Sequence, residues 1–563
     1  MNTKSLSFRA AVVQTLAELG DLDANITLTQ SHVEEAVRQG ARLIVLPECM
    51  NSGYLFDSEA HCREIAEPVT GRYVQALAEL CRKHNIFIGT GFTEWDEDKG
   101  KVFNSALLID PRGELILHYH KQFLATHDQN WFEFGERGCP VVDTELGRIG
   151  LLICFDGRIP EIARSLALQG AEVILDMANF FAMDQADLWV PARAYENGVW
   201  IVAATKSGVE RSIYYPGGSM IVSPDGETKA YVPYDTHGVA SAEIFPEQAR
   251  NKSWFYGANR WSDRRPDTYS LLRAPFEETP LASLLDQPLI PEQATAKGAA
   301  VQAHATFSTG SLEEALDMLD HAAKLGSKLL VLPQHMTFSS WLPSRSDVEQ
   351  NREARDHALQ RVQSICKRYD CSVVLPIFME DAGQFVPTAV VIGPGGNELG
   401  RQQQIHLEPE MVSWAKGGDC FTVIDTPSGR LGVLLGYDGM FPESSRVLAL
   451  AGADIIAWCS AWRHPNDRKL LTMPKAEDNR CFLICANRSD APYPGGSFIA
   501  PPTGFPQWDM DLAAPPVLRH NAVQPGFMNL ALARQKSMIP GVDMIRNRIT
   551  DTYEVLIADK NVG

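Results

Sequence analysis

The chain repeats itself. The stretch RIGLLICFDGRIPE at residues 148–161 returns as RLGVLLGYDGMFPE at residues 430–443, which is 282 positions later. The stretch YPGGSMIVSP, which begins at Tyr215, returns as YPGGSFIAPP from Tyr493, 278 positions later. A near-constant offset indicates a tandem duplication, because chance reuse of one motif would not preserve the spacing of another.

The duplication predicts two units of similar size, as expected for a chain of 563 residues. We predict a first unit at residues 1–275, a polar and proline-containing linker at 276–297, and a second unit at 298–563. Each unit opens with a strand, an amphipathic helix and a wholly apolar strand. An apolar strand of this kind is typical of a sheet buried on both faces, so an α/β fold with helices outside and sheets inside follows.

Composition narrows the class of protein. The net charge of −19 argues against a nucleic-acid surface and against an anionic membrane. No apolar run is long enough to span a bilayer, and the N-terminus lacks the apolar core of a signal peptide. The 11 cysteines have no regular spacing and no histidine partners at metal-ligand spacing. We therefore expect a cytoplasmic protein with free thiols, no metal and no cofactor.

Three residues of the first unit follow predicted strands and carry reactive groups. They are Glu48 in VLPECM, Lys121 in HYHKQFL and Cys154 in LLICFDGRIPE. A cysteine at a strand-to-helix turn lies near backbone N–H groups and a helix dipole, and both favour the thiolate. An acid can take the thiol proton, and a lysine can stabilise an oxyanion. Taken singly, however, each residue is more often a core cysteine, a cap or a solvated charge.

The second unit serves as an internal comparison. Where the first unit has Glu48, Lys121 and Cys154, it reads VLPQHM, QQQIHL and LLGYDG. The matching residues are Gln334, Gln404 and Gly436. The flanking scaffold is retained, so packing does not explain the loss of all three groups. We predict that the trio is catalytic in the first unit and that the second unit is degenerate and inactive.

These motifs resemble the nitrilase, or carbon–nitrogen hydrolase, superfamily over nearly the whole chain. The ordered Glu in LPE, Lys in HK and Cys in ICFDGRIPE carry the resemblance. The resemblance implies an αββα sandwich in each unit, with the two units paired through their outer layers as an intramolecular pseudo-dimer. It also implies that Cys154 forms a thioester with Glu48 as base, while Lys121 and the backbone N–H of Phe155 hold the oxyanion.

Further site residues are suggested by the same resemblance. The superfamily tends to have a second glutamate between the lysine and the cysteine, where this sequence offers Asp128 and Glu133. Asp128 lies 26 positions before Cys154, as Glu410 lies before Gly436, so we favour Asp128 as the auxiliary acid. Candidate contacts to substrate are Asn179, Phe180 and Trp131.

The residues after the cysteine indicate the reaction. Cys-Phe-Asp-Gly-Arg differs from the Cys-Trp-Glu of true nitrilases and resembles the amidase and carbamoylase branches. We therefore expect a small amide or N-carbamoyl substrate and release of ammonia or an amine. Three alternatives remain open: a nitrilase acting on a nitrile, a soluble acyltransferase, and a non-catalytic binding protein on the same scaffold. Assembly of the two-unit chain into a homo-oligomer also remains open.

Overall fold

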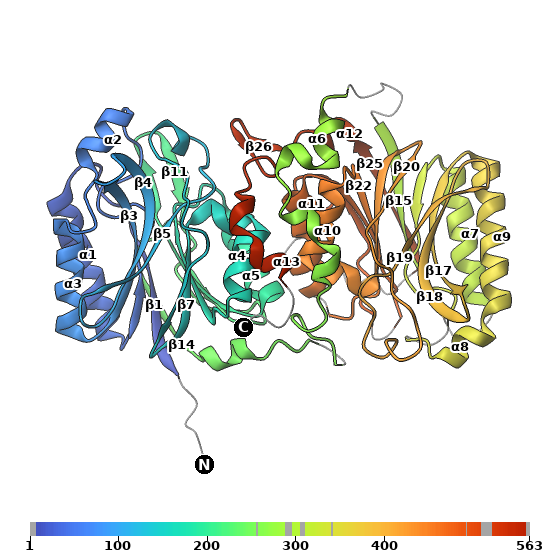
Figure 1. The fold of residues 1–563 in the computed structure, drawn as a ribbon, viewed down its shortest axis with the longest axis horizontal. Helices are drawn as coiled ribbons and strands as arrows, with labels where there is room; N and C mark the ends of the chain where they lie inside the picture. The colour runs from blue at the N-terminus through green and yellow to red at the C-terminus, as the bar shows by residue number, and fades with distance from the viewer. Residues whose placement is uncertain are drawn as a thin grey trace, which may run out of the picture.

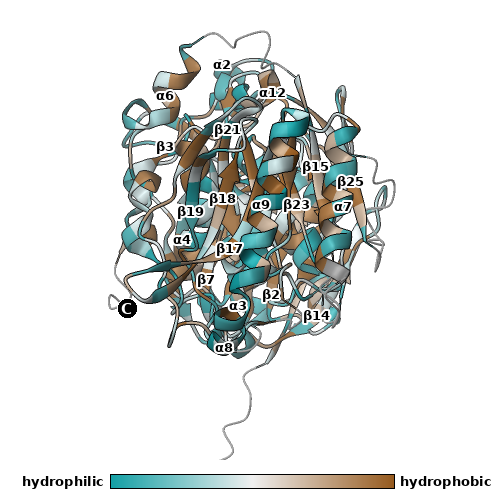
Figure 2. Ribbon diagram, turned by 90° about the vertical axis from the view of Figure 1, so that its right-hand side faces the viewer, coloured by the Kyte–Doolittle hydropathy of each residue, from teal (hydrophilic) through white to brown (hydrophobic). Residues whose placement is uncertain are grey.

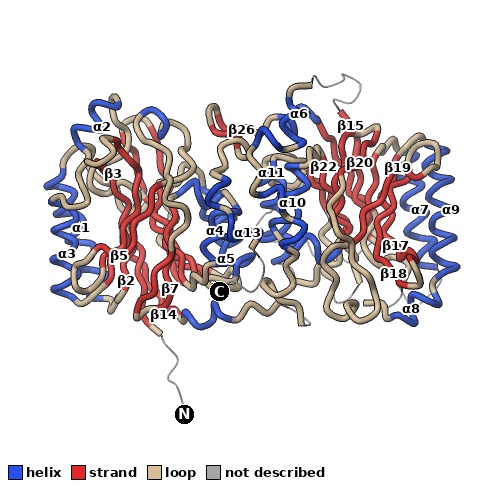
Figure 3. Tube along the Cα trace, viewed as in Figure 1, coloured by secondary structure: helices blue, strands red, loops and turns tan. Residues whose placement is uncertain are grey.

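The computed structural model describes residues 7–254, 257–287, 295–303, 310–338, 342–464, 466–490, 493–507 and 521–558. Two units lie side by side along the longest axis of the molecule (Figure 1). In each unit two sheets pack face to face between layers of helices (Figure 3). This arrangement confirms the predicted pair of αββα sandwiches.

The first unit contains two six-stranded sheets. The outer sheet has the order β14 (Gly238–Ile244), β1 (Phe8–Gln14), β2 (Leu43–Val45), β3 (Phe87–Asp96), β4 (Lys101–Ile109), β5 (Leu115–His120). The inner sheet has the order β13 (Thr228–Tyr231), β12 (Met220–Val222), β9 (Trp200–Thr205), β8 (Val173–Ala178), β7 (Gly147–Leu152), β6 (Val141–Thr144). The remaining elements are α1 (Leu22–Arg38), α2 (Glu59–Ile65), α3 (Arg72–His84), α4 (Pro160–Leu168), α5 (Val190–Asn197) and the hairpin of β10 (Ser207–Glu210) and β11 (Ile213–Pro216).

The second unit repeats this topology. Its outer sheet has the order β19 (Glu398–Gln403), β18 (Gln384–Ile392), β17 (Ser372–Asp381), β16 (Leu329–Val331), β15 (Thr295–Gln302), β25 (Ala522–Asn529). Its inner sheet has the order β20 (Val423–Thr426), β21 (Gly429–Leu435), β22 (Ile455–Cys459), β23 (Phe482–Ala486), β24 (Phe498–Ala500). Its helices are α7 (Gly310–Lys324), α8 (Arg345–Gln350), α9 (Arg352–Tyr369), α10 (Pro442–Leu450) and α11 (Met473–Asn479). Shorter elements are α6 (Pro280–Leu285), α12 (Leu530–Arg534), α13 (Glu554–Ile557), β26 (Ser537–Ile539) and β27 (Val542–Asp543).

The outer helices are amphipathic and cover the sheets with one face. Helix α1 begins where the Asp21 side chain accepts a hydrogen bond from the backbone N–H of Ala24, and it buries Val33 and Ala36 against the outer sheet. Seen from the end of the second unit, hydrophobic strands lie behind helices α7 and α9, which carry hydrophilic stretches (Figure 2). Burial of these apolar faces is the main force that holds the layers together.

The two units meet through the helices that cover their inner sheets. Helices α4 and α5 face α10 and α11 at the centre of the molecule (Figure 1). The Arg164 Nε atom lies 2.8 Å from Glu443, and the equivalent Arg446 Nε atom lies 2.8 Å from Glu161. These pairs connect equivalent residues in both directions, as across the two-fold axis of a homodimer. The predicted pseudo-dimer is therefore confirmed.

The predicted linker at 276–297 contains more structure than its composition suggested. Helix α6 lies within it and buries Leu281 against Leu272 and Tyr553, while β15 begins at Thr295 rather than at residue 298. Residues 288–294 lie outside the described part of the chain. The end of the chain also returns to the first unit, where the Gln129 side chain donates a hydrogen bond to Gly541 O at 2.7 Å.

We expect Glu443→Gln to destabilise the contact between the units. Glu443 is 3% exposed and accepts hydrogen bonds from Arg164 and Arg264, whose charges outweigh burial and lower its pKa to about 2. The substitution leaves two buried guanidinium groups uncompensated, so the free energy of unfolding should fall by about 3 kcal/mol. Chemical denaturation at pH 7 measures this. Because a lowered carboxyl pKa stabilises the fold only while the group is ionised, the difference from wild type should shrink as the pH falls below 4 toward 2. A denaturation midpoint at pH 7 equal to that of the wild type would show that Glu443 does not stabilise the contact between the units.

Candidate active site

Three strand ends of the first unit converge on a buried cluster. Glu48 lies after β2, Lys121 directly follows β5, and Cys154 begins the turn after β7. The Lys121 Nζ atom lies 2.7 Å from Glu48 Oε1 and 2.7 Å from Asp128 Oδ2. The exposed fractions of Glu48, Lys121 and Cys154 are 1%, 1% and 2%, so the cluster is shielded from bulk water. The structure therefore brings the predicted trio and the favoured auxiliary acid together.

One carboxylate oxygen of Glu48 accepts hydrogen bonds, and the other accepts none among the described residues. Asn104 donates a hydrogen bond to Oε1 at 2.6 Å, while Oε2 has no hydrogen-bond partner among the described residues. The backbone of β3 passes very close, since a Cβ atom on Gly91 would lie 2.3 Å from Glu48 Cα. Burial raises the pKa of Glu48, although the Lys121 ammonium opposes this shift. Oε2 is thus a desolvated acceptor suited to taking a proton.

Cys154 lies in a strained turn. Its φ of 51° is in the left-handed region, which is costly for a residue other than glycine. Its backbone N–H donates to Asp176 Oδ1 at 2.8 Å. Burial raises the pKa of the thiol well above its ordinary value, the Glu48 carboxylate adds to this, and the Lys121 ammonium opposes it. The thiol therefore needs a base, which is the role expected of Glu48.

The two candidate auxiliary acids have different environments. Asp128 is fully buried, and its carboxylate accepts hydrogen bonds from the Lys121 ammonium and from the Tyr54 hydroxyl. Glu133 is about half exposed and pairs with Lys101 at 2.5 Å on the surface. The proposal of Glu133 as an auxiliary acid is therefore wrong, because its carboxylate is solvated and already paired with another lysine.

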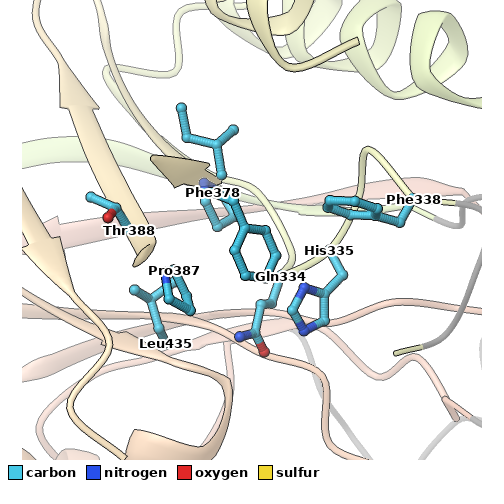
Figure 4. A pocket seen from close by; sticks show the side chains of 9 residues that line it. Gln334, His335, Phe338, Phe378, Pro387, Thr388 and Leu435 are labelled. Atoms are coloured by element: carbon cyan, nitrogen blue, oxygen red, sulfur yellow. The ribbon is translucent and has the colours of Figure 1, made fainter. Parts of the chain in front are cut away.

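In the equivalent region of the second unit, a side chain at position 436 would require the ends of Gln334 and Glu408 to move. A Cβ atom on Gly436 would lie 2.0 Å from Gln334 Oε1 and 2.6 Å from Glu408 Oε1. Gln334 lies beside His335 in a small cavity lined by Phe338 and Phe378 (Figure 4). Gln334 donates a hydrogen bond to Gln404 at 3.1 Å. A neutral amide network thus fills the space where the first unit carries its charges.

Glu408, not Glu410, corresponds to Asp128. The Gln404 backbone N–H bonds Pro387 O just as that of Lys121 bonds Asn104 O, which confirms the match of Gln404 with Lys121. The Gln404 side chain then donates to Glu408 Oε2 at 2.8 Å, whereas Glu410 is exposed. Counting back from the cysteine position gave the wrong match because the two loops differ in length. Glu408 lies four residues after Gln404, whereas Asp128 lies seven residues after Lys121.

The predicted substrate contacts are all near this cluster. Asn179 is fully buried, and neither side-chain amide atom has a partner in the described part of the chain. Its backbone N–H contacts the Cys154 thiol and lowers the thiol pKa slightly. Phe180 is buried and donates its backbone N–H to Thr205 Oγ1 at 2.9 Å. The Trp131 indole nitrogen is buried without a described partner.

A second lysine and several aromatic rings lie around the cluster. The Lys206 Nζ atom lies 4.3 Å and 4.9 Å from the ring centres of Tyr215 and Tyr54, and it pairs with Glu210 at 2.5 Å. The His127 ring lies 4.8 Å from that of Tyr54. Tyr215 stands in the duplicated YPGG motif, whereas no sequence motif marked Tyr54 or Glu210.

One group of potential metal ligands was also missed. Within the described ranges, Glu94, His118 and His120 bring three ligand atoms within 4.8 Å of one another. Glu94 Oε2 hydrogen-bonds both imidazoles, at 2.6 and 3.1 Å, and the Arg137 guanidinium donates to the same His120 nitrogen at 3.2 Å. The guanidinium already places a positive charge there, which disfavours a metal ion. Among the described residues, Glu48, Asp128 and Cys154 do not form such a group.

Comparison with known proteins identifies the family. The model of the carbon–nitrogen hydrolase family matches twice, at residues 9–252 and at residues 297–506. The chain belongs to the carbon–nitrogen hydrolase family. The two matches confirm the tandem duplication, and membership identifies the protein as a hydrolase of carbon–nitrogen bonds.

Relatives of this hydrolase each match about half of the chain. A nitrilase of Pyrococcus abyssi is 36% identical over 262 residues, which cover 46% of this chain and 98% of that protein. A formamidase of Helicobacter acinonychis is 29% identical over 243 residues, covering 42% and 72%. A structure of an amidase from Nesterenkonia sp. AN1 with acrylamide is 24% identical, has a TM-score of 0.40, and covers 45% of this chain and 96% of its own. No helix among the described residues is long and apolar enough to cross a membrane.

We expect Gly436→Cys to leave the second unit without activity. The new side chain would collide with Gln334 and Glu408, so overpacking should lower the free energy of unfolding by about 2 kcal/mol. The double variant Cys154→Ala, Gly436→Cys should release no ammonia from amides. Its second unit still has Gln334 and Gln404 where the first unit has Glu48 and Lys121. Denaturation and an ammonia assay measure both effects. Turnover by this double variant would show that the second unit is competent.

Proposed function

We propose that the first unit hydrolyses a small amide or N-carbamoyl compound through a thioester on Cys154. The observation that carries this proposal is the unoccupied Oε2 of Glu48, held by Lys121 beside a buried thiol. A desolvated carboxylate next to a thiol of raised pKa is a general base matched to its acid. The enclosure of the cluster favours small substrates.

In the proposed first half-reaction, Glu48 Oε2 takes the Cys154 proton as sulfur attacks the carbonyl carbon. Negative charge then develops on the carbonyl oxygen, where the Lys121 ammonium and the backbone N–H of Phe155 stabilise it. Burial alone would lower the pKa of Lys121, but the carboxylates of Asp128 and Glu48 raise it well above its ordinary value, which keeps it charged. Collapse of the intermediate breaks the C–N bond, and Glu48 returns the proton to the leaving nitrogen.

In the second half-reaction, Glu48 takes a proton from water as the water oxygen attacks the thioester. Cleavage of the C–S bond releases the acid, and Glu48 returns the proton to the sulfur, which restores the thiol and the carboxylate. Asp128 contributes by holding Lys121, and Asn179 is proposed to bind polar atoms of the substrate with its two unpartnered amide atoms. Phe180 and Trp131 are proposed to border the substrate. The second unit is proposed to be catalytically inactive.

The cellular setting is also a proposal. All 11 cysteines are free, and 10 of them are buried, which suits a reducing compartment such as the cytoplasm. The proposed partner is a small amide or carbamoyl compound rather than a macromolecule. Pairing of whole chains into a homo-oligomer is an additional hypothesis that sedimentation can test.

We expect Cys154→Ala to abolish ammonia release from small primary amides and N-carbamoyl amino acids while the fold is retained. Glu48→Gln should lower kcat/KM by at least about 10³-fold, because it removes both the base and the proton donor. A coupled ammonia assay measures turnover, and thermal unfolding monitors the fold. Turnover by Cys154→Ala at the wild-type rate would exclude the thioester route. Hydrolysis of nitriles alone by the wild type would instead favour the nitrilase alternative.

The pH dependence of kcat/KM should report Glu48. Activity requires the Glu48 carboxylate, so the rate should rise with pH as this group loses its proton. Because burial raises its pKa, the midpoint of the acid limb should lie above the ordinary glutamic acid value of 4.5. Initial rates from pH 3 to pH 9 in buffers of constant ionic strength measure this. An acid limb centred at or below 4.5 would rule out Glu48 as the titrating base.

A further inference from the structure

The nucleophile turn is held by an arginine from the same unit. The turn runs from Cys154 to Arg158 and presents its last two carbonyls to Arg193 of helix α5. Arg193 Nε donates to Gly157 O at 2.8 Å, and Nη2 donates to Arg158 O at 3.0 Å. Since Cys154 has a strained backbone, such outside contacts are needed to keep it in place.

The position of Arg193 depends on the second unit. Its Nη2 atom donates to Asp478 Oδ1 at 2.7 Å, and its Nη1 atom donates to Glu196 at 2.9 Å. Asp478 lies on α11 and is 3% exposed, so this ion pair is screened from solvent. Burial by itself would lower the pKa of Arg193, but the carboxylates of Asp478 and Glu196 raise it.

A second contact across the units reaches the turn directly. The Arg158 guanidinium, at the end of the turn, donates to Glu477 Oε1 at 2.5 Å and to Asp184 at 2.8 Å. Its centre lies 4.5 Å from the Trp189 ring centre. Glu477 precedes Asp478 on α11. Adjacent residues of one helix therefore contact Arg158 of the turn and Arg193, which holds the turn.

The corresponding contacts of the two turns differ. The residues of the second unit that match Arg158 and Arg193 are Met440 and Lys475. Asn479 caps Lys475 O at 2.8 Å as Asn197 caps Arg193 O at 3.0 Å, which confirms this match. Pseudo-symmetry alone would have produced the same clamp on both turns. Lys475 interacts electrostatically with Glu196, the match of Asp478, but no hydrogen bond joins Lys475 to the Gly436–Met440 turn among the described residues. In the described part of the chain, guanidinium contacts to a turn occur only in the unit with the nucleophile, where each arginine pairs with one carboxylate of its own unit and one of the other.

We propose that Glu477 and Asp478 are positioning residues for Cys154, through which the second unit supports the reaction of the first. The inference rests on the proposed role of Cys154 as nucleophile. Asp478 acts by fixing Arg193 on the carbonyls of Gly157 and Arg158, and Glu477 acts by fixing the Arg158 side chain. Their loss lets the turn relax, which displaces the sulfur from Glu48 Oε2 and from the carbonyl carbon of the substrate. A displacement near 1 Å slows such a reaction by about a hundredfold.

The test compares Asp478→Asn and Glu477→Gln with a matched control. Asp467→Asn is the control, because Asp467 is also fully buried and bonds across the units, to the Tyr195 hydroxyl at 2.7 Å, without touching the turn. Two rates are measured: kcat and KM for an amide, and alkylation of Cys154 by iodoacetamide, followed by mass spectrometry of its peptide. Alkylation needs no turnover, so it tests the turn even if no amide is hydrolysed.

We expect each test variant to lower kcat and the alkylation rate at least about tenfold with KM nearly unchanged, while Asp467→Asn stays within about twofold of wild type. Asp478→Glu should recover part of the loss, and Arg193→Lys with Asp478→Asn should be no slower than Arg193→Lys alone. Thermal unfolding of all variants separates these effects from loss of fold. If Asp478→Asn does not fold, the kcat and alkylation rate of Glu477→Gln alone test the proposal. Wild-type rates in both test variants, or equal losses in the control, would overturn the proposal.

Discussion

The active-site architecture depends on one buried ammonium group. Lys121 lies between Glu48 and Asp128 at 2.7 Å from each, with all three side chains withdrawn from water. If Lys121 were removed, two carboxylates would be buried without compensation, which is far more costly than losing a surface pair. The outer sheet must therefore hold the loops after β2 and β5 together around this lysine.

The same constraint explains the second unit. Replacement of Glu48 and Lys121 by glutamines removes the buried ammonium and one of its two carboxylate partners, and it keeps an acid in Glu408. Gln334 bonds Gln404, and Gln404 bonds Glu408, whose pKa burial raises to about 7. The helical layer of the second unit contacts the first unit, and there α11 supplies carboxylates to Arg158 of the nucleophile turn and to Arg193 of α5.

Much of this was predictable from the sequence because a duplicated chain contains its own comparison. The loss of three polar groups within a retained scaffold identified Glu48, Lys121 and Cys154, and the apolar strands indicated the sandwich. Predictions failed where the length of a loop or a contact between distant segments determines where a side chain lies. Glu410 was matched to Asp128 because residues were counted across loops of unequal length, and Glu133 was considered because spacing does not report burial. Contacts such as Gly91 with Glu48, Lys206 with Tyr54, and Asp478 with Arg193 join distant segments, and no local pattern records them.

The central claim is that one chain carries one nucleophile, and that this nucleophile is Cys154. Rapid-quench mass spectrometry of the intact protein with a slowly turned-over amide, followed by peptide mapping, tests it most directly. The account predicts a single acyl group per chain during the first turnover, located on the peptide that contains Cys154. Two acyl groups per chain, an acyl group on another residue, or ammonia release with no acylated protein would contradict it.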